Sequence, residues 1–367
     1  MAGTKNLGDF NELISPFLKN KIENIKSEYG ENSAEYNSIA KQYIKTEIEK
    51  KILNDEKKRH YYSELEIYFH NKKLEGVERL YKRTVLIEPT TVCAAHCRWC
   101  LRGQYPIKTL SEDNIDLATK YFGSEDLKKD VDEVLITGGD PLMSLPKLKE
   151  TLNKIKINAP NIKIIRIGTR VPFQDPRRVN DDMLNIFSTF RNFRFEIGIN
   201  VNHPLEFWPE SIEAIQRLKK LNITIYNQNP LLKGVNDNFE TLARLYDLLR
   251  QNEIEAHYLF HAIPLAGMSH HRTSLKKGYD LIGRLSSSGE FSGRSKPKYA
   301  VLSDIGKIVI YENTIIEVDK SNNNILLQSG FKFEDRIKWN PSWKKSESIL
   351  IDKNGFMQTW YKDGMDN

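Results

Sequence analysis

All three cysteines of this 367-residue chain lie in one short segment, CAAHCRWC, at residues 93–100. An odd, clustered set of cysteines in a long chain is not a disulfide framework, which is typical of small domains with many paired cysteines. The spacing of Cys93, Cys97 and Cys100 is C-x3-C-x2-C. Thiolates are the usual ligands of iron–sulfur clusters. The segment therefore predicts a metal or cluster site at one fixed point of the fold.

Three thiolates suit three irons of a [4Fe–4S] cluster, and the fourth iron then has no protein ligand. The amino and carboxylate groups of S-adenosylmethionine can chelate such an open iron, and an electron from the cluster can cleave the sulfonium to a 5′-deoxyadenosyl radical. The alternative is a zinc site with a fourth ligand from elsewhere. Only one short cysteine pair is present, and His96 adjoins Cys97 too closely to share its metal, so the cluster is favoured.

Short apolar or β-branched runs alternate with helical stretches from Arg83 onward. The predicted strands are Thr84–Glu88, Glu133–Thr137, Lys163–Gly168, Arg194–Asn200, Ile223–Asn227 and Glu255–His261. Segments between them, such as LPKLKETLNKIKINA and NFETLARLYDLLRQNEI, have apolar residues at helical spacing. This alternation predicts an α/β fold with right-handed βαβ units, a partial (β/α)6 TIM-type barrel. In such barrels the functional site lies at the carboxyl ends of the strands.

The segments on either side of the barrel differ in character. Residues 1–80 are rich in Glu, Lys, Ile and Leu at helical spacing, so we expect an N-terminal helical region that covers the core, contacts another copy of the chain, or both. Residues 81–298 are expected to form the barrel. Residues 299–367 contain short strands joined by polar turns, which predicts a β-rich, antiparallel C-terminal extension.

Composition limits the classes of function. The formal net charge of +6, from 55 basic and 49 acidic residues, is too small to indicate nucleic-acid binding by itself. No apolar run approaches the roughly 20 residues that span a bilayer. The first residues show no basic segment followed by an apolar stretch. We therefore expect no nucleic-acid or membrane partner, and a cytoplasmic location.

Several ordered motifs resemble those of the radical SAM superfamily, and most closely those of the lysine 2,3-aminomutase family. The matching stretches are CAAHCRWCLR, DEVLITGGDPLM, IIRIGTRVP, NVNHPLEFW, NQNPLLKGVND and MSHHRT. They cover about residues 83–285. The resemblance implies a radical SAM barrel in which the three cysteines hold a [4Fe–4S] cluster that binds S-adenosylmethionine.

The resemblance also implies which residues surround the cofactor and the substrate. The expected S-adenosylmethionine contacts are Trp99, Gly138, Gly139, Asp140, Arg170, His203 and Gln228. Two adjacent glycines allow a ligand to approach the backbone closely, although an ordinary turn is the alternative. Simple packing is the alternative for Trp99. Arg102, two residues after Cys100, is expected to bind a substrate carboxylate, because a guanidinium fork suits a carboxylate.

The chain departs from the family where pyridoxal phosphate binds. The aminomutases hold this cofactor as a Schiff base on a lysine in a Gly-rich loop, and no such loop is visible here. Lys307, in IGKI, is the best-placed candidate, ahead of Lys296 and Lys298, although a solvent-facing strand lysine is the alternative. At the place of the family's phosphate-binding arginine stands Leu80, with Arg79 beside it.

A third departure concerns the substrate. The family's first aspartate for the distal ammonium of lysine is missing in the segment His261-Ala262-Ile263-Pro264, and Asp304 is the candidate for the second. A buried ammonium without a carboxylate is costly, so we do not expect free lysine as the substrate. Histidines gather in or near this segment as candidates for polar contacts or proton transfer: His257, His261, His270 and His271.

Two enzymatic outcomes follow. The first is a radical SAM enzyme that abstracts hydrogen from a small carboxylate-bearing, amino-acid-like substrate without pyridoxal phosphate. The second is a pyridoxal phosphate-dependent amino-acid 2,3-aminomutase with Lys307 as the Schiff-base lysine. The first is favoured because the departures all concern pyridoxal phosphate or the diamino substrate. Either would need an external electron donor of flavodoxin or ferredoxin type, and a homo-oligomer stays open. A zinc-binding module without enzymatic activity is the remaining alternative.

Overall fold

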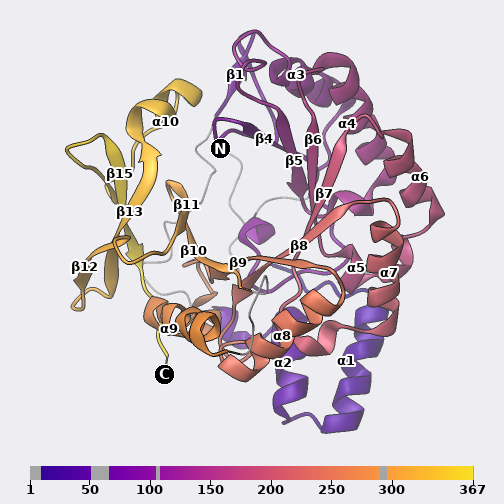
Figure 1. Ribbon diagram of the computed structural model, residues 1–367, viewed down its shortest axis with the longest axis vertical. Helices are drawn as coiled ribbons and strands as arrows, with labels where there is room; N and C mark the ends of the chain where they lie inside the picture. The colour runs from indigo at the N-terminus through magenta and orange to yellow at the C-terminus, as the bar shows by residue number, and fades with distance from the viewer. Residues whose placement is uncertain (1–9, 51–65, 105–107, 290–295, 367) are drawn as a thin grey trace.

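The computed structural model describes residues 10–50, 66–104, 108–289 and 296–366. It is built around a curved nine-stranded sheet with the strand order β11-β10-β9-β8-β7-β6-β5-β4-β3 (Figure 1). The strands of this sheet are β3 (Val77–Glu78), β4 (Thr84–Thr90), β5 (Glu133–Gly138), β6 (Ile164–Thr169), β7 (Arg194–Ile199), β8 (Thr224–Leu231), β9 (Glu255–His261), β10 (Lys298–Ser303) and β11 (Gly306–Val309).

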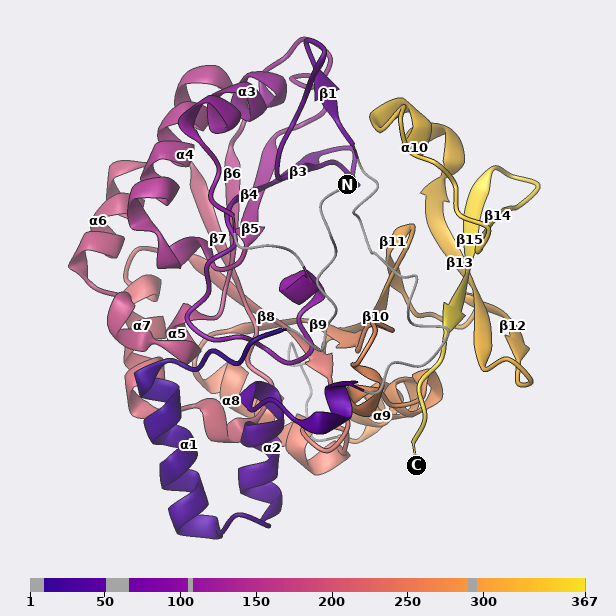
Figure 2. The same ribbon diagram turned by 180° about the vertical axis from the view of Figure 1, so that it is seen from behind.

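The six predicted barrel strands all form, as β4 to β9, and each pairs in parallel with the next. Helices cover the outer face of the sheet (Figures 1 and 2). They are α3 (Glu112–Phe122), α4 (Leu145–Asn158), α5 (Val171–Gln174), α6 (Asp181–Thr189), α7 (Pro209–Lys219), α8 (Phe239–Gln251) and α9 (Leu275–Ser287). The predicted partial (β/α)6 barrel is therefore confirmed.

Side chains alternate between the two faces of the barrel sheet. In β5 and β6 every second residue is fully buried beneath the helices, and the residues between them are half-buried on the inner face. Val134, Ile136, Ile165 and Ile167 belong to the continuous apolar core between sheet and helices. The inner face carries polar residues such as Arg166, which donates to the Glu133 carboxylate over 2.9 Å. The inner face thus carries polar side chains that can line a site.

Strand β10 differs from the expectation that everything after residue 299 is antiparallel. It pairs in parallel with β9, and only then does β11 turn back antiparallel. Tyr299, Ala300 and Val301 are buried, as expected of an interior strand. The barrel sheet thus continues into the segment assigned to the C-terminal extension.

The N-terminal region is helical only in part. It contains α1 (Pro16–Tyr29), α2 (Ala34–Tyr43) and the short 3-10 helix η2 (Glu47–Lys50). Ser15 and Ser33 cap the two helices by accepting hydrogen bonds from backbone N–H groups, which fixes where each begins. Residues 66–80, expected to be helical, instead form β1 (Tyr68–Phe69), β2 (Lys72–Lys73) and β3. The part of the predicted helical region at residues 1–9 and 51–65 lies outside the described residues.

The C-terminal extension is β-rich, as predicted. Its four-stranded antiparallel sheet has the order β12-β13-β15-β14, and helix α10 (Phe333–Trp339) follows β13. The strands are β12 (Ile315–Asp319), β13 (Asn324–Lys332), β14 (Ile349–Ile351) and β15 (Phe356–Lys362). In the described part of the chain, no helix combines the length and apolar character needed to cross a bilayer.

Candidate active site

A cavity of about 320 Å³ lies at the carboxyl ends of the barrel strands. Its walls come from the cysteine loop, residues 93–100, and from residues that follow β5, β6, β7 and β9. The predicted site residues that line it are Cys93, Cys97, Trp99, Cys100, Arg102, Gly138, Gly139, Asp140, Arg170 and Gln228. His203 and Lys307 are not among its lining residues. The fold therefore brings together most of the residues that the sequence singled out.

The three cysteines are free, half-buried thiols. Arg170 Nη1 donates to Cys97 Sγ over 3.0 Å, and Gln174 Nε2 donates to the same sulfur over 3.4 Å. Burial raises the pKa of the Cys93 thiol, and the Arg170 guanidinium opposes that rise. A metal must therefore displace the Cys93 proton on binding, which makes the site sensitive to the charge around it.

The three cysteines line one cavity. In the described ranges, no three His, Cys, Asp or Glu side chains are grouped so that they could hold a single metal ion. A zinc site needs ligands that converge on one point. The thiolates of a [4Fe–4S] cluster each bind a different iron. A cluster would take one thiolate for each of three irons, whereas zinc would need a fourth ligand beside the three cysteines.

Gly138 and Gly139 lie against the backbone that leads into the cysteine loop. Gly138 has a φ of +120°, and a Cβ on it would come within 2.4 Å of the Thr90 carbonyl oxygen. A Cβ on Gly139 would lie 2.3 Å from the Thr91 carbonyl carbon and 2.4 Å from the Val92 oxygen. The close approach that requires glycine here is therefore made by the chain itself, while the same residues also line the cavity.

Replacing Gly139 with alanine is expected to displace residues 91–92 and to destabilise the protein by about 2 kcal/mol or more, because the obstacle is backbone. Gly283→Ala is the matched control, since a Cβ there meets nothing within 4 Å. Thermal unfolding of the two variants measures the difference. Equal stability of the two variants would contradict the packing described here.

Asp140 uses its carboxylate inside the protein. The Thr169 hydroxyl donates to both carboxylate oxygens at 2.8 Å, and the Arg170 N–H donates over 2.7 Å. The N–H groups of Leu142 and Val171 complete the set. Burial raises the pKa of Asp140, and these hydrogen bonds act against that rise. Asp140 therefore ties the end of β5 to the end of β6, a different use of its carboxylate from the cofactor contact expected.

Arg170 is the most connected residue of the site. Its guanidinium lies over the Trp99 ring at 5.1 Å and over the Tyr43 ring at 5.2 Å. Nη2 donates to Glu206 over 2.8 Å, and Nε donates to the Asn200 carbonyl over 2.7 Å. Trp99 thus packs against an arginine that reaches the cysteine loop, and its expected contact with S-adenosylmethionine stays a prediction.

His203 is not among the residues that line the cavity, and its expected cofactor contact stays a prediction. Its Nδ1 accepts from the Leu205 N–H over 3.2 Å, at the start of the short 3-10 helix η7 (Pro204–Glu206). Burial lowers the pKa of His203 to about 4, so the ring is neutral near pH 7. Gln228 is half-buried and lines the cavity as expected.

Arg102 lines the cavity, but its charge is met by acidic side chains of the protein. Nε contacts the Glu88 carboxylate, and Nη2 lies 3.5 Å from Glu78 Oε1. Burial raises the pKa of Glu78 to about 7, against the attraction of Arg102. The expected role of Arg102 in binding a substrate carboxylate therefore requires that a substrate compete with these two acids.

Lys307 lies on the inner side of the sheet rather than facing solvent. Its Nζ is 4.0 Å from the centre of the Tyr258 ring and 5.9 Å from that of Tyr81. Burial lowers the pKa of Lys307 to about 8, and the nearby Arg166 adds to that shift. At neutral pH, the uncharged fraction of the Lys307 amine is therefore larger than that of an exposed lysine amine.

His261 is buried in the cavity wall at the end of β9. Its Nε2 lies 2.9 Å from the Thr273 carbonyl oxygen, so Nε2 carries the proton, and its Nδ1 lies 2.8 Å from the Tyr361 hydroxyl. Burial lowers its pKa to about 3. Tyr361 belongs to β15, so the C-terminal extension supports this wall.

Stability is expected to depend on the protonation of His261. Because its pKa rises from about 3 to about 6.5 on unfolding, the unfolded state binds the extra proton, and stability falls as pH drops through this window. His261→Gln keeps a donor and an acceptor but removes the titration. Between pH 4 and 6, the slope of the unfolding free energy against pH should be smaller in this variant than in the wild type by up to about 1.4 kcal/mol per pH unit. Denaturant titration at several pH values measures this slope. An unchanged slope would contradict this assignment.

The residues that sequence reasoning missed hold the predicted ones in place. Glu206 is fully buried and accepts from the Arg170 guanidinium and from the N–H groups of Asn202 and His203. The side chains of Gln42 and Tyr43 also donate to it. The HPLE segment was the available signal, since a capping residue followed three positions later by Glu marks a helix start.

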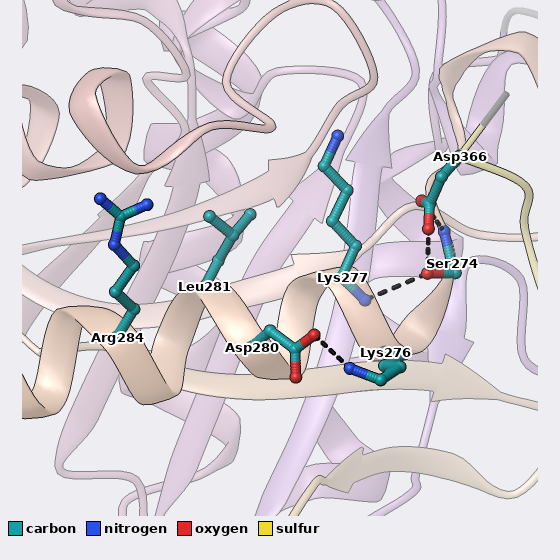
Figure 3. Close-up of a pocket in the computed structure, with 7 residues that line it drawn as sticks. All are labelled: Ser274, Lys276, Lys277, Asp280, Leu281, Arg284 and Asp366. Carbon is teal, nitrogen blue, oxygen red and sulfur yellow. Dashed lines mark hydrogen bonds and ion pairs between the residues drawn. The ribbon is translucent and has the colours of Figure 1, made fainter.

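A second hollow, of about 370 Å³, lies along α9 (Figure 3). Its charges are paired within the protein: Lys276 with Asp280, Lys277 with Asp237, and Arg284 with Glu240. Asp366 accepts from the N–H and the hydroxyl of Ser274 (Figure 3). This hollow therefore lies where the C-terminal residues contact the start of α9, and we assign no site to it.

Comparison with known proteins agrees with this geometry. A family model for the radical SAM superfamily matches residues 87–246, from β4 into α8. The chain is 35% identical over 233 residues to a protein of Aquifex aeolicus provisionally assigned as an L-lysine 2,3-aminomutase, covering 62% of this chain and 61% of that one. It is 30% identical over 246 residues to the L-lysine 2,3-aminomutase of Methanococcus maripaludis, covering 66% and 55%.

The L-lysine 2,3-aminomutase of Buchnera aphidicola is 32% identical over 230 residues, covering 62% of this chain and 66% of that protein. The matches thus span less than two thirds of these relatives' own lengths. Residues 87–246 are therefore a radical SAM domain, and the relatives that the chain matches carry the lysine 2,3-aminomutase name.

Proposed function

We propose that this protein reductively cleaves S-adenosylmethionine at a [4Fe–4S] cluster and uses the resulting radical to abstract hydrogen from a small amino-acid-like substrate. The superfamily implies S-adenosylmethionine and an iron–sulfur cluster. The observation that carries the proposal is that all three cysteines line one cavity at the carboxyl ends of the strands. Cys93, Cys97 and Cys100 would each bind one iron.

When bound, such a cluster supplies the electron that breaks the S-adenosylmethionine sulfonium bond. The chain's own residues would hold the cysteine loop and shield the reacting centre from water. Arg170, fixed by Glu206 and stacked on Trp99, donates to the Cys97 sulfur and stabilises negative charge on it. Gln228 offers an amide to a ligand in the cavity. Apolar residues of the wall, such as Phe260 and Ile263, restrict water near the reacting centre.

The environment of Arg102 bears on the substrate class. If the substrate carries a carboxylate, this group must displace Glu88 from the guanidinium. The Glu78 pKa of about 7 lets this acid take up a proton near neutral pH. The two acids beside Arg102, Glu78 and Glu88, can therefore lose one negative charge at little cost in free energy. This supports a carboxylate-bearing substrate whose binding is accompanied by proton uptake.

A second candidate is a pyridoxal phosphate-dependent amino-acid 2,3-aminomutase, favoured by the surroundings of Lys307. Its pKa of about 8 suits a Schiff-base lysine. Within the described residues, no carboxylate forms an ion pair with it. The family's phosphate-binding arginine has no counterpart at Leu80, and Arg79 stacks on the Trp339 ring instead. Lys307 would bind the aldehyde, and the group when bound would carry the migrating nitrogen.

The test is anaerobic reconstitution with iron and sulfide, followed by reduction with dithionite in the presence of S-adenosylmethionine. We expect about four irons per protein and formation of 5′-deoxyadenosine, measured by chromatography. Reconstituted protein that carries the cluster but forms no 5′-deoxyadenosine would contradict the proposal, as would a colourless protein with one bound zinc.

A further inference from the structure

We infer that a buried ion pair between Glu49 and Arg98 is a positioning device that holds the cysteine loop in the geometry that retains its cluster. From the sequence, the N-terminal helical region is expected to cover the core, to contact another copy of the chain, or both. The inference rests on the proposed function, and it assigns these helices to the cofactor site itself.

Arg98 lies between Cys97 and Trp99 but points away from the cavity. Its side chain is fully buried, with an exposed fraction of 0%, and that of Glu49 is 4% exposed. Arg98 Nε donates to Glu49 Oε1 over 3.0 Å, and Nη2 contacts the other carboxylate oxygen. This bidentate pair fixes the direction of the arginine as well as its position.

The rest of the guanidinium binds the segment that precedes α1. Nη2 donates to the Phe10 carbonyl over 3.1 Å, and Nη1 donates to the Asn11 carbonyl over 3.3 Å. The Phe10 ring lies 4.7 Å from the guanidinium carbon. Arg98 is therefore surrounded by N-terminal residues on every side that its donors reach.

The backbone of the cysteine loop is held by the same region. The Arg98 N–H donates to the Gln42 carbonyl over 3.0 Å, and the His96 N–H donates to the Leu13 carbonyl over 2.8 Å. Ala95 packs in an apolar cluster with α1 and α2. Main-chain contacts on both sides of Cys97 thus come from residues before the barrel.

This arrangement gives Glu49 a role that a surface ion pair does not have. A loop that presents three thiolates to three irons must hold each sulfur in place, and residues just outside the ligand set typically change metal affinity about 10–100-fold when altered. Loss of the Glu49 charge leaves Arg98 buried without its counter-ion. The loop next to Cys97 is then free to shift.

The test compares Glu49→Gln with Glu210→Gln, both reconstituted anaerobically. Glu210 is the matched control, because its 2.9 Å ion pair with Lys21 also joins the N-terminal helices to the barrel but is exposed and does not touch the cysteine loop. We expect E49Q to lose iron to a chelator at least about tenfold faster than the wild type, while E210Q matches the wild type. Equal rates for E49Q and the wild type would overturn the inference.

A double variant separates positioning from folding. In Glu49→Leu with Arg98→Met, no charge is left unpaired, so the fold is expected to be kept. Fast iron loss from this folded double variant supports the inference, and wild-type retention overturns it. A wild-type protein that takes up no iron–sulfur cluster would instead refute the proposed function, so the two failures are distinguishable.

Discussion

Alanine at Cys93, Cys97 or Cys100 is expected to abolish 5′-deoxyadenosine formation, down to the background of the assay without protein. The physical reason is that a cluster iron without its thiolate is exchanged or lost, so the electron has no route to S-adenosylmethionine. Each variant is reconstituted, its iron is quantified, and the product is measured after dithionite reduction.

The control for these variants is Val92→Ala, a truncation in the same stretch of chain. Val92 is 38% exposed and donates its N–H, not its side chain, to the Thr90 hydroxyl. We expect it to retain both iron and product. If any cysteine variant kept wild-type product formation, the assignment of that cysteine as a cluster ligand would be wrong.

The second prediction with a large expected effect concerns the replacement of Lys307. If pyridoxal phosphate is bound, borohydride reduction should trap it on one peptide, and Lys307→Ala should remove that adduct completely. The reason is local: burial lowers the Lys307 pKa to about 8, so this amine is more nucleophilic at neutral pH than a solvated one. Mass spectrometry of the digested protein locates the adduct.

Lys298→Ala serves as the comparison, because Lys298 is an exposed lysine at the start of neighbouring β10. It should leave the adduct in place. An adduct that survives Lys307→Ala would mean that another lysine is used. A wild-type protein with no adduct would leave the hydrogen-abstracting enzyme without pyridoxal phosphate as the proposed function.

Much of the barrel is predictable from local pattern. Each of β4 to β9 is a short β-branched run between amphipathic helices, and period and composition suffice to identify such units. The cysteine loop is predictable because its three cysteines are close in sequence. The segment YAVLS predicts a strand but does not indicate the strand with which it pairs. The parallel pairing of β10 with β9, in place of the expected antiparallel arrangement, therefore could not be predicted from the sequence.

The contacts of single polar residues within the protein are harder to predict from the sequence. Asp140 and Arg170 line the cavity, but the hydrogen bonds that the structure shows for them are to the protein: Asp140 accepts from Thr169, and Arg170 donates to Gln42 and also lies over the Tyr43 ring. No spacing rule relates α2 to residues that follow β6 and β7. The Arg102 pair with Glu88 also depends on tertiary packing, since β3 and β4 bring Glu78 and Glu88 to the same side.

The most direct test of the account is the electron paramagnetic resonance spectrum of the reduced protein with and without S-adenosylmethionine. We predict the signal of a reduced [4Fe–4S] cluster that changes when S-adenosylmethionine is added, because its amino and carboxylate groups bind the iron that lacks a cysteine. A reduced cluster whose signal is unaffected by saturating S-adenosylmethionine would contradict the central claim.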